Sequence, residues 1–289
     1  PITDDDFDQD MYAADYLVPL AKKIFETEGT KWLHQAQEIW LDHFREISVE
    51  AMLTLIRQDL MNLGVHMDVF TSEKELVKNK QIDKSLNLLE KKGDTYQGIL
   101  EPPKGHVIDD WEPRPQTLFK ATTYGDDVDR PLRKSNGDWT YFAGDFAYHH
   151  YKLERGFDCL INVFGADHSG YVKRIQAAVK ALTSGQKNLE IKVCQMVNFL
   201  DNGVPVRMSK RAGTFITLKE VVERVGKDAT RYMMVSRHQD MAIDFDFAKI
   251  IEQNRENPIF YIQYAHARIQ SVLRHSRDIF PDLNLKNTV

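Results

Sequence analysis

The chain has 289 residues, of which 42% are hydrophobic and 28% charged, and its formal net charge is −5 at pH 7. Such a chain is a globular protein that is long enough to bury a large core in two or three lobes. Its acidic balance excludes a protein that coats nucleic acid by overall charge, although a local basic face stays compatible with it. No apolar run approaches the ~20 residues that a membrane-spanning helix needs.

The first 116 residues are predicted to be mainly helical. Apolar side chains recur at steps of three and four residues over 12–25, 32–63 and 82–89. A further helix is predicted to start at Glu73, where Thr71 or Ser72 can cap it and acids favour the first turn. Residues 65–70 alternate enough to form a strand. Prolines and glycines make 101–116 irregular, and we place a domain boundary there.

A turn rich in carboxylates follows the strand that is predicted over 117–123. It holds Asp126, Asp127 and Asp129 close together, and acids at this density can ligate Mg²⁺. In the alternative, which is favoured here, these side chains bond the backbone of the turn and Arg130.

A strand, a polar loop and a helix follow one another in the second half of the chain. Residues 159–164 are apolar and predict a strand that is buried on both faces. Because Cys159 and Cys194 both stand in such runs, they are predicted to be buried free thiols in a reducing compartment. After the loop at 165–170 comes an amphipathic helix over 172–182. Open α/β sheets bind ligands at the carboxyl ends of their strands, so this loop is a candidate site.

Tyr141 and Asp145 lie four residues apart, just before that strand. If a helix opens near Gly144, the phenol and the carboxylate can face one pocket. A buried carboxylate is costly unless a cation or several donors meet it. A guanidinium fits best, because its planar fork bonds both carboxylate oxygens. In the alternative, Asp145 caps the helix and Tyr141 packs in the core.

A basic loop follows a predicted hairpin. Residues 191–200 are strand-like, and Asn202 and Gly203 are typical of a tight hairpin turn. The cations of the loop are Arg207, Lys210 and Arg211. Cations so placed can meet the charge that develops on phosphates during their transfer. Alone, such a segment could also be an exposed basic turn.

The C-terminal part is predicted to be helical. A capping box stands at 217–220, and residues 242–247 alternate between apolar and acidic side chains. A long amphipathic helix is predicted over 259–273. Its polar face, with His266 and Arg268, can contact RNA phosphate or be ordinary solvated surface.

Several segments together resemble bacterial arginyl-tRNA synthetases, which are class I aminoacyl-tRNA synthetases. The most specific are 135–150, 164–171 and 206–214. Residues 256–268 are similar to the start of that family's helical anticodon-binding domain. Residues 124–130 and, more weakly, 12–16 also resemble the family. The resemblance covers nearly all of the chain.

The sequence departs from the family at one signature. The His-x-Gly-His motif of the family is missing, and Lys104-Gly105-His106 does not replace it. The chain opens on Pro1 in mid-pattern and stops soon after the helical domain begins. We therefore expect an internal fragment of a longer protein, which is inactive by itself.

The resemblance implies an α/β fold. It predicts the second half of a Rossmann-like parallel sheet, a mainly helical insertion before it, and the start of a helical anticodon-binding bundle after it. The expected segments are 1–116 for the insertion, 117–245 for the catalytic domain and 246–289 for the start of the bundle.

The resemblance also implies a reaction in two steps. L-arginine is activated by ATP to arginyl-adenylate, and the arginyl group then passes to the 3′ end of tRNA(Arg). The residues expected to bind arginine are Tyr141, Asp145 and Asp167. Those expected to bind ATP are Gly165, His168, Met196, Met208 and Lys210. The expected catalytic residues, which would stabilise the pyrophosphate, are Lys210, Ser209 and Arg211.

The family's substrates and setting complete these expectations. ATP is expected together with Mg²⁺, and no protein metal site is identified in the sequence. The partners would be tRNA(Arg), L-arginine and ATP, with no membrane, and the protein would be a cytoplasmic monomer. Two alternatives remain: another class I aminoacyl-tRNA ligase or nucleotidyltransferase, and a non-catalytic RNA-binding protein derived from a synthetase.

Overall fold

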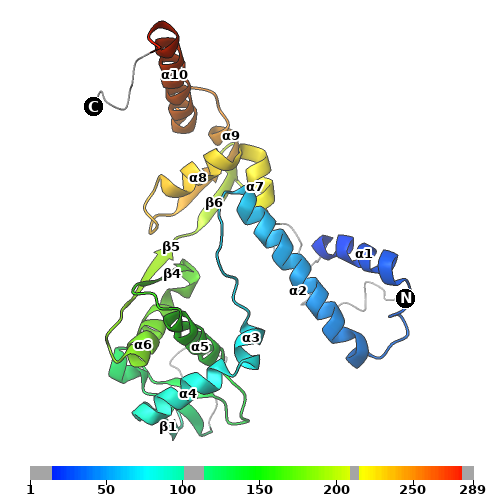
Figure 1. The fold of residues 1–289 in the computed structure, drawn as a ribbon, viewed down its shortest axis with the longest axis vertical. Helices are drawn as coiled ribbons and strands as arrows, with labels where there is room; N and C mark the ends of the chain where they lie inside the picture. Colours follow the sequence, from blue (N-terminus) through cyan, green and yellow to red (C-terminus); the bar gives the residue numbers. More distant parts are fainter. Residues whose placement is uncertain (1–14, 101–113, 209–214, 282–289) are drawn as a thin grey trace. The chain divides into compact units, whose positions relative to one another are not determined.

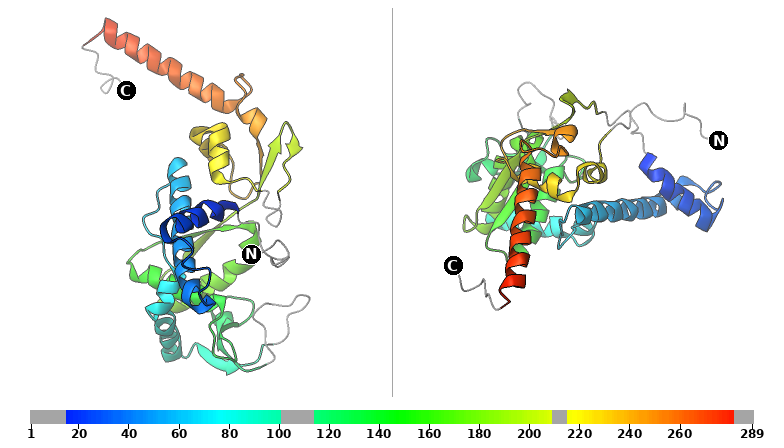
Figure 2. Two further views of the ribbon diagram at one scale, coloured as in Figure 1. Left: turned by 90° about the vertical axis from the view of Figure 1, so that its right-hand side faces the viewer. Right: turned by 90° about the horizontal axis from the view of Figure 1, so that it is seen from above.

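The computed structural model describes residues 15–100, 114–208 and 215–281 (Figures 1 and 2). The chain divides into two compact units. The first unit comprises Pro1–His66, Val197–His238 and Ala242–Val289, and the second comprises Met67–Met196 and Gln239–Met241. These limits differ from the predicted segment boundaries at 116 and 245.

The second unit contains one antiparallel sheet and one parallel strand pair. Its elements are α3 Glu73–Lys78, α4 Gln81–Lys92, β1 Thr95–Gly98, β2 Gln116–Phe119, η3 Ala121–Tyr124, β3 Arg130–Arg133, α5 Tyr141–Glu154, β4 Leu160–Gly165, η4 Ala166–Tyr171, α6 Val172–Thr183 and β5 Leu189–Cys194. The antiparallel sheet has the order β1-β2-β3, and β4 pairs in parallel with β5 across α6 (Figure 1). This β4-α6-β5 unit confirms the predicted succession of strand, loop and helix.

The core of the second unit is apolar and holds α5 in place. Phe119 of β2 and Phe146 of α5 meet edge to face with their ring centroids 5.5 Å apart. Ile175 of α6 and Leu89 of α4 belong to the same buried cluster. Because these side chains are almost fully buried, their removal from water is a major stabilising contribution to this unit.

The strand β4 is buried on one face only. Leu160 and Asn162 are 5% and 8% exposed, whereas Ile161 and Val163 are 55% and 68% exposed. Cys159, just before the strand, is also exposed. The predictions of a strand buried on both faces and of a buried Cys159 are therefore wrong, because the described elements cover β4 from one side.

The first unit contains two N-terminal helices, a small mixed sheet and further helices. Its elements are η2 Asp15–Leu17, α1 Val18–Glu28, α2 Gln37–Asn62, β6 Val197–Asp201, β7 Val204–Pro205, α7 Leu218–Val225, α8 Lys227–Val235, β8 Ile243–Asp246, α9 Phe247–Ile250 and α10 Pro258–Ile279. β6 pairs antiparallel with β7 and parallel with β8. In the described ranges, no helix has the length and apolar character that crossing a membrane requires.

The hairpin turn between β6 and β7 follows the sequence prediction. Asn202 and Gly203 have φ angles of 51° and 77°, which is the left-handed region that a tight turn of this kind needs. Below the turn, the rings of Phe199 and Phe247 stack at 5.5 Å, and Phe245 meets both edge to face. These three aromatic side chains form the centre of the first unit's core.

Three predicted strands differ from the structure. Residues 65–70 form no strand. The strand predicted over 117–123 is the short β2 of the antiparallel sheet, and a 3₁₀ helix follows it. The run 191–200 is divided between β5 and β6, which belong to different sheets, and between them Gln195 N donates to Gln239 O at 2.8 Å. An apolar alternation becomes a strand only where the fold supplies a partner strand, and the partner is not visible in the local pattern.

Candidate functional site

The helix α5 begins at Tyr141 because Thr140 caps it. Thr140 Oγ1 accepts a hydrogen bond of 3.3 Å from the backbone of the first turn, and it donates one of 2.8 Å to Pro131 O. The second bond ties the start of the helix to β3. Because residues at i, i+4 and i+7 share one side of a helix, Tyr141, Asp145 and Tyr148 form one stripe, which we call the pocket face.

A pocket of about 310 Å³ lies against the pocket face of α5. Its lining residues are Thr71, Glu73, Leu76, Tyr141, Gly144, Asp145 and Tyr148. Two carboxylates and two phenols therefore share one space, and none of these described residues is a cation. Tyr141 is 72% exposed and Thr140 is the helix cap, so the alternative in which Tyr141 packs in the core and Asp145 caps the helix does not hold.

The carboxylate of Asp145 is half-buried and short of donors. Burial raises the pKa of Asp145, and the negative charge of Glu73 raises it further, against the attraction of Arg174, His168 and Lys152. Among the residues that the structure describes, none donates a hydrogen bond to this carboxylate. A cation that entered the pocket would stabilise the ionised form of Asp145 and reverse the shift.

Glu73 is the site residue that the sequence analysis did not find. The local pattern shows it as an acid in the first turn of α3, beside the cap that Ser72 provides by accepting from Glu75 N at 3.4 Å. The fold brings it to α5 at Gly144, where a Cβ atom would lie 3.0 Å from Glu73 Oε1. Glycine at this position thus lets the second carboxylate approach the helix, and no local signal in the sequence relates residues so far apart.

The loop after β4 carries the other predicted residues of this region. Asp167 and His168 lie in η4 with side chains 72% and 62% exposed, and Asp167 Oδ2 is 3.6 Å from His168 Nε2. A Cβ atom at Gly165 would lie 2.5 Å from Asp167 Oδ1, so the absence of a side chain there leaves room for that carboxylate. His168 attracts Asp145 electrostatically, whereas Asp167 does not line the pocket.

The predicted ATP-binding and catalytic residues are only partly described. Met196 follows β5 at the limit of the second unit and is 63% exposed. Met208 belongs to the first unit and is 48% exposed. Ser209, Lys210 and Arg211 lie outside the described residues. The basic loop therefore stays a prediction from the sequence.

The carboxylates of the turn before α5 accept hydrogen bonds from neighbouring backbone and side-chain groups. Asp126 accepts from Arg130 Nε and Nη2 at 2.7 and 2.8 Å, and from Asp127 N at 2.7 Å. Burial acts to raise the pKa of Asp126, but the Arg130 hydrogen bonds and charge outweigh it and the pKa is lowered. Asp129 Oδ1 accepts from the backbone and hydroxyl of Thr122 at 3.0 and 2.7 Å. This is the self-bonded turn that the sequence analysis favoured over a metal site.

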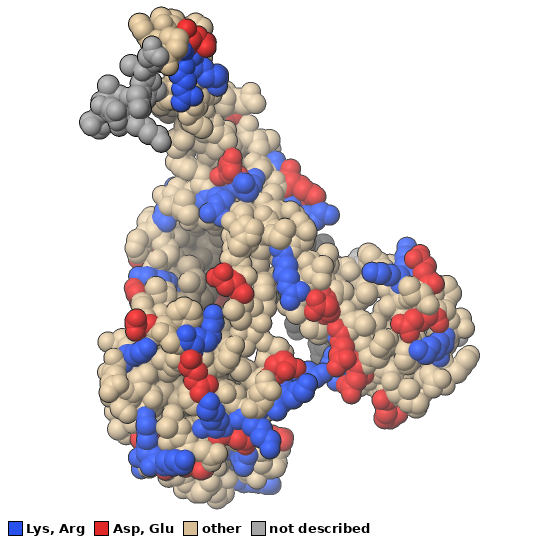
Figure 3. Space-filling model, viewed as in Figure 1, with Lys and Arg blue, Asp and Glu red and all other residues tan. Residues whose placement is uncertain are grey.

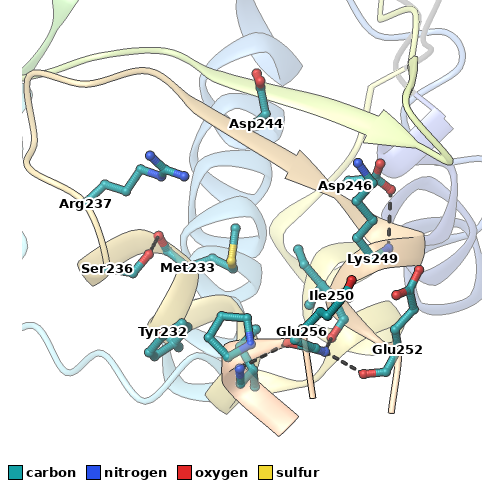
Figure 4. Close-up of a pocket in the computed structure, with 13 residues that line it drawn as sticks. Tyr232, Met233, Ser236, Arg237, Asp244, Asp246, Lys249, Ile250, Glu252 and Glu256 are labelled. Carbon is teal, nitrogen blue, oxygen red and sulfur yellow. Dashed lines mark hydrogen bonds between the residues drawn. The ribbon is translucent and has the colours of Figure 1, made fainter. Parts of the chain in front are cut away.

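A larger pocket of about 610 Å³ lies in the first unit (Figure 4). Figure 4 shows its side chains, which come from α8 and the residues just after it, from β8, from α9, and from the chain between α9 and the first residues of α10. Two of its polar side chains bond the protein itself: Asp246 accepts from Gly203 N at 2.8 Å and from Ala248 N at 3.1 Å, and Asn257 donates to Ile250 O at 2.8 Å. These groups tie the hairpin and the helix starts together, and none of the described site candidates lines the pocket.

Charge on the visible surface is mixed. Figure 3 shows lysine and arginine interspersed with aspartate and glutamate rather than gathered by sign. The two carboxylates of the pocket on α5, Asp145 and Glu73, are a local concentration of negative charge on an otherwise mixed visible surface.

Comparison with known sequences places this chain near one group of enzymes. No protein-family model matches it. It is 57% identical over 274 residues to an arginine–tRNA ligase of Rhodospirillum rubrum, and the matched region covers 95% of this chain and 46% of that protein. It is 54% identical over 267 residues to an arginine–tRNA ligase of Ruegeria pomeroyi, which covers 92% and 46%. The chain thus spans about half the length of the curated relatives that it matches.

Solved structures agree with this similarity. A Campylobacter jejuni structure described as an arginyl-tRNA synthetase matches with a TM-score of 0.79 and 32% identity, over 93% of this chain and 55% of that one. The arginyl-tRNA synthetase of Thermus thermophilus matches with a TM-score of 0.65 over 91% of this chain and 49% of that one, and at 18% identity it shows the fold alone. The predicted α/β fold class is confirmed.

Proposed function

This chain belongs to the family of arginyl-tRNA synthetases, and on that premise we propose that the protein activates L-arginine with ATP and transfers the arginyl group to its tRNA. The observation that carries the proposal is the pocket on α5, where Asp145 and Glu73 face one space. A guanidinium bound there can donate two parallel hydrogen bonds to the oxygens of one carboxylate, and the charge of the second carboxylate attracts it. A lysine ammonium has no such planar fork, so the pocket favours arginine.

The proposed reaction needs no side-chain nucleophile. An oxygen of the arginine carboxylate attacks the α-phosphorus of ATP, the bond from that phosphorus to the bridging oxygen breaks, and pyrophosphate leaves. A ribose hydroxyl at the 3′ end of the tRNA then attacks the carbonyl carbon of arginyl-adenylate, and AMP leaves. The rate therefore depends on positioning and on stabilisation of charge at the phosphates.

The proposed roles divide between the two parts of the site. Tyr141 and Asp145, with Glu73, meet the guanidinium, and Asp167 lies toward the other end of the amino acid. The residues proposed to line the ATP site are Gly165, His168, Met196, Met208 and Lys210. The residues proposed to meet the leaving pyrophosphate are Lys210, Ser209 and Arg211. Mg²⁺ enters with ATP as part of the substrate, and the protein works as a cytoplasmic monomer.

Binding of arginine and of citrulline tests the proposal. Citrulline has the shape of arginine but a neutral ureido group, so the two carboxylates discriminate between the ligands by charge. Calorimetry on the full-length gene product is expected to show arginine binding about 10- to 150-fold tighter than citrulline, which corresponds to ~1.5–3 kcal/mol of charge-assisted hydrogen bonding. The Asp145→Asn substitution should remove most of this difference.

A matched control is Asp158→Asn. Asp158 is a fully exposed carboxylate that precedes β4, at the end opposite Gly165, and it pairs with Lys187 at 3.8 Å. This variant should keep the preference for arginine. Equal affinities for arginine and citrulline in the unaltered protein would contradict the proposal, and ATP–pyrophosphate exchange with a different amino acid would identify another class I ligase instead.

A further inference from the structure

A buried chain of polar groups joins α5 to β4 behind the pocket face. Lys152 Nζ is 2.7 Å from Asn162 Oδ1, Asn162 Nδ2 is 2.8 Å from His149 Nε2, and His149 Nδ1 is 2.7 Å from the backbone oxygen of Asp145. His149 and Asn162 are only 3% and 8% exposed. Phe146, three residues before His149 on the same helix, belongs to the apolar core cluster.

The chemistry of the end groups decides the direction of every hydrogen bond in this chain. The lysine ammonium can only donate, so the Asn162 oxygen faces Lys152 and the Asn162 amide NH₂ faces His149. His149 Nε2 must then accept, which leaves the proton on Nδ1. The Asp145 carbonyl can only accept, and it receives that proton's hydrogen bond. All four groups are satisfied in one arrangement, with His149 neutral.

Such a network selects one placement of the helix on the strand. Apolar side chains tolerate small slides and rotations because their attraction has no direction. A shift of α5 along β4 would separate His149 from Asn162 and leave buried polar groups without partners, which costs more than the shift of an apolar contact. These hydrogen bonds therefore add a directional restraint on the height and rotation of α5 to the apolar packing that holds the helix.

We propose that Lys152, Asn162 and His149 are positioning residues that hold the pocket face of α5 in register with β4. Asn162 lies three residues before Gly165, so the same network sets Asp145 relative to the loop that follows β4. These three side chains act through the backbone of Asp145 and touch no ligand. The inference rests on the proposed function for the identity of that ligand as arginine.

Two substitutions of Asn162 test the network. Asn162→Ala and Asn162→Leu each remove both the acceptor for Lys152 and the donor to His149, and Asn162→Leu roughly keeps the size of the side chain. Each is expected to weaken arginine binding about tenfold in calorimetry on the full-length gene product. When His149→Leu is added to Asn162→Leu, arginine binding should weaken by less than a further twofold, because the hydrogen-bond network is already lost.

A matched control separates positioning from stability. Tyr124 OH donates to Asp94 Oδ2 at 2.8 Å, and the Tyr124 ring packs on the same core cluster. Tyr124→Phe removes one hydrogen bond of that core, and it should lower Tm while it changes the arginine affinity by less than twofold. If the Asn162 variants also lower Tm but keep the arginine affinity of the unaltered protein, the network is structural only and the inference is overturned.

Nitrogen-15 NMR of the histidine rings gives a readout that does not need a ligand. His149 should show a protonated Nδ1 and an unprotonated Nε2, and the Nε2 signal should move in Asn162→Leu. A protonated Nε2 in the unaltered protein would overturn the order of donors. Loss of arginine preference in the unaltered protein would instead contradict the proposed function, and the NMR result would still decide whether the network exists.

Discussion

At the scale of single residues, the surroundings of Asp145 in the pocket on α5 disfavour its ionised form. Asp145 is half-buried without a described donor, and Glu73 adds a second negative charge beside it. Burial and the charge of Glu73 both raise the pKa of Asp145, and the charge of a cation that enters the pocket would offset both effects. The empty pocket is thus less favourable for Asp145 than the occupied one, which is how a binding site gains affinity from charge.

The substitution Glu73→Gln should change the pocket in two ways. Arginine binding should weaken about tenfold, because one of two attracting charges is lost at an exposed position. The pKa of Asp145 should fall toward its usual range, because Glu73 no longer opposes its ionisation. Calorimetry and a carbon-13 NMR titration of Asp145 measure the two effects.

A control for this change lies on the same helix. Glu75 is an exposed acid of α3 that does not line the pocket and pairs with Lys78 at 3.8 Å. Glu75→Gln should leave both measurements as they are. If Glu73→Gln raised the pKa of Asp145 or left it unchanged, the two carboxylates would not share one pocket.

At the scale of secondary structure, α5 combines an exposed binding stripe with a buried polar anchor. The pocket face looks into open space, while His149 is turned into the protein and hydrogen-bonded on both ring nitrogens. Burial, and next the charge of Lys152, lowers the pKa of His149 to about 4. The helix therefore depends on a neutral histidine.

This neutral histidine predicts a loss of stability in acid. The usual pKa of histidine is 6.5 and that of folded His149 is about 4. Between these values the unfolded chain binds a proton that the folded chain does not, so the free energy of unfolding rises with pH. The contribution is complete above pH ~6.5 and falls by up to ~3 kcal/mol as the pH approaches 4.

Urea unfolding at several pH values measures this slope. Asp145, whose pKa is raised, lowers the free energy of unfolding as the pH rises above the usual pKa of 3.8, which is opposite to the effect of His149. The slope of the unaltered protein is therefore compared with that of His149→Leu, in which the effect of Asp145 is still present. The slope of stability with pH between about 4 and 6.5 should be smaller in His149→Leu. Equal slopes in the two proteins would show that the fold does not lower the pKa of His149.

At the scale of the whole molecule, the residues proposed for arginine binding and those proposed for the phosphates belong to different segments of the chain. The pocket on α5 belongs to the second unit, and Arg207, with which the basic loop begins, belongs to the first. Positive charge near a leaving pyrophosphate is needed only as the bond breaks, whereas the role proposed for the pocket on α5 is in binding. Substitutions in the two units should therefore affect different steps.

Lys210→Ala tests this separation. ATP–pyrophosphate exchange by the full-length gene product should fall about 100-fold, the size of effect that follows loss of one charge-stabilising group. The affinity for arginine should change by less than twofold. Lys219→Ala is the control, because Lys219 is an exposed cation of α7 that pairs with Glu223 at 3.8 Å. Unchanged exchange in Lys210→Ala would refute the role of the loop.

Local sequence patterns were sufficient for much of this protein. The turn at Asn202 and Gly203, the cap at Ser72 and the β4-α6-β5 unit all depend on residues close in sequence, because backbone preference and side-chain spacing act over a few positions. The spacing of Tyr141 and Asp145 likewise predicted two groups on one face of a helix.

Contacts between distant segments required the folded chain. Glu73 reaches α5 only when α3 packs near Gly144, and Asn162 meets His149 only when β4 lies under that helix. The division of 191–200 into two strands likewise follows from which partners are present. Hydrogen bonds and charges act through space, so a periodic pattern reveals which side chains share a face but not which distant residue lies opposite them.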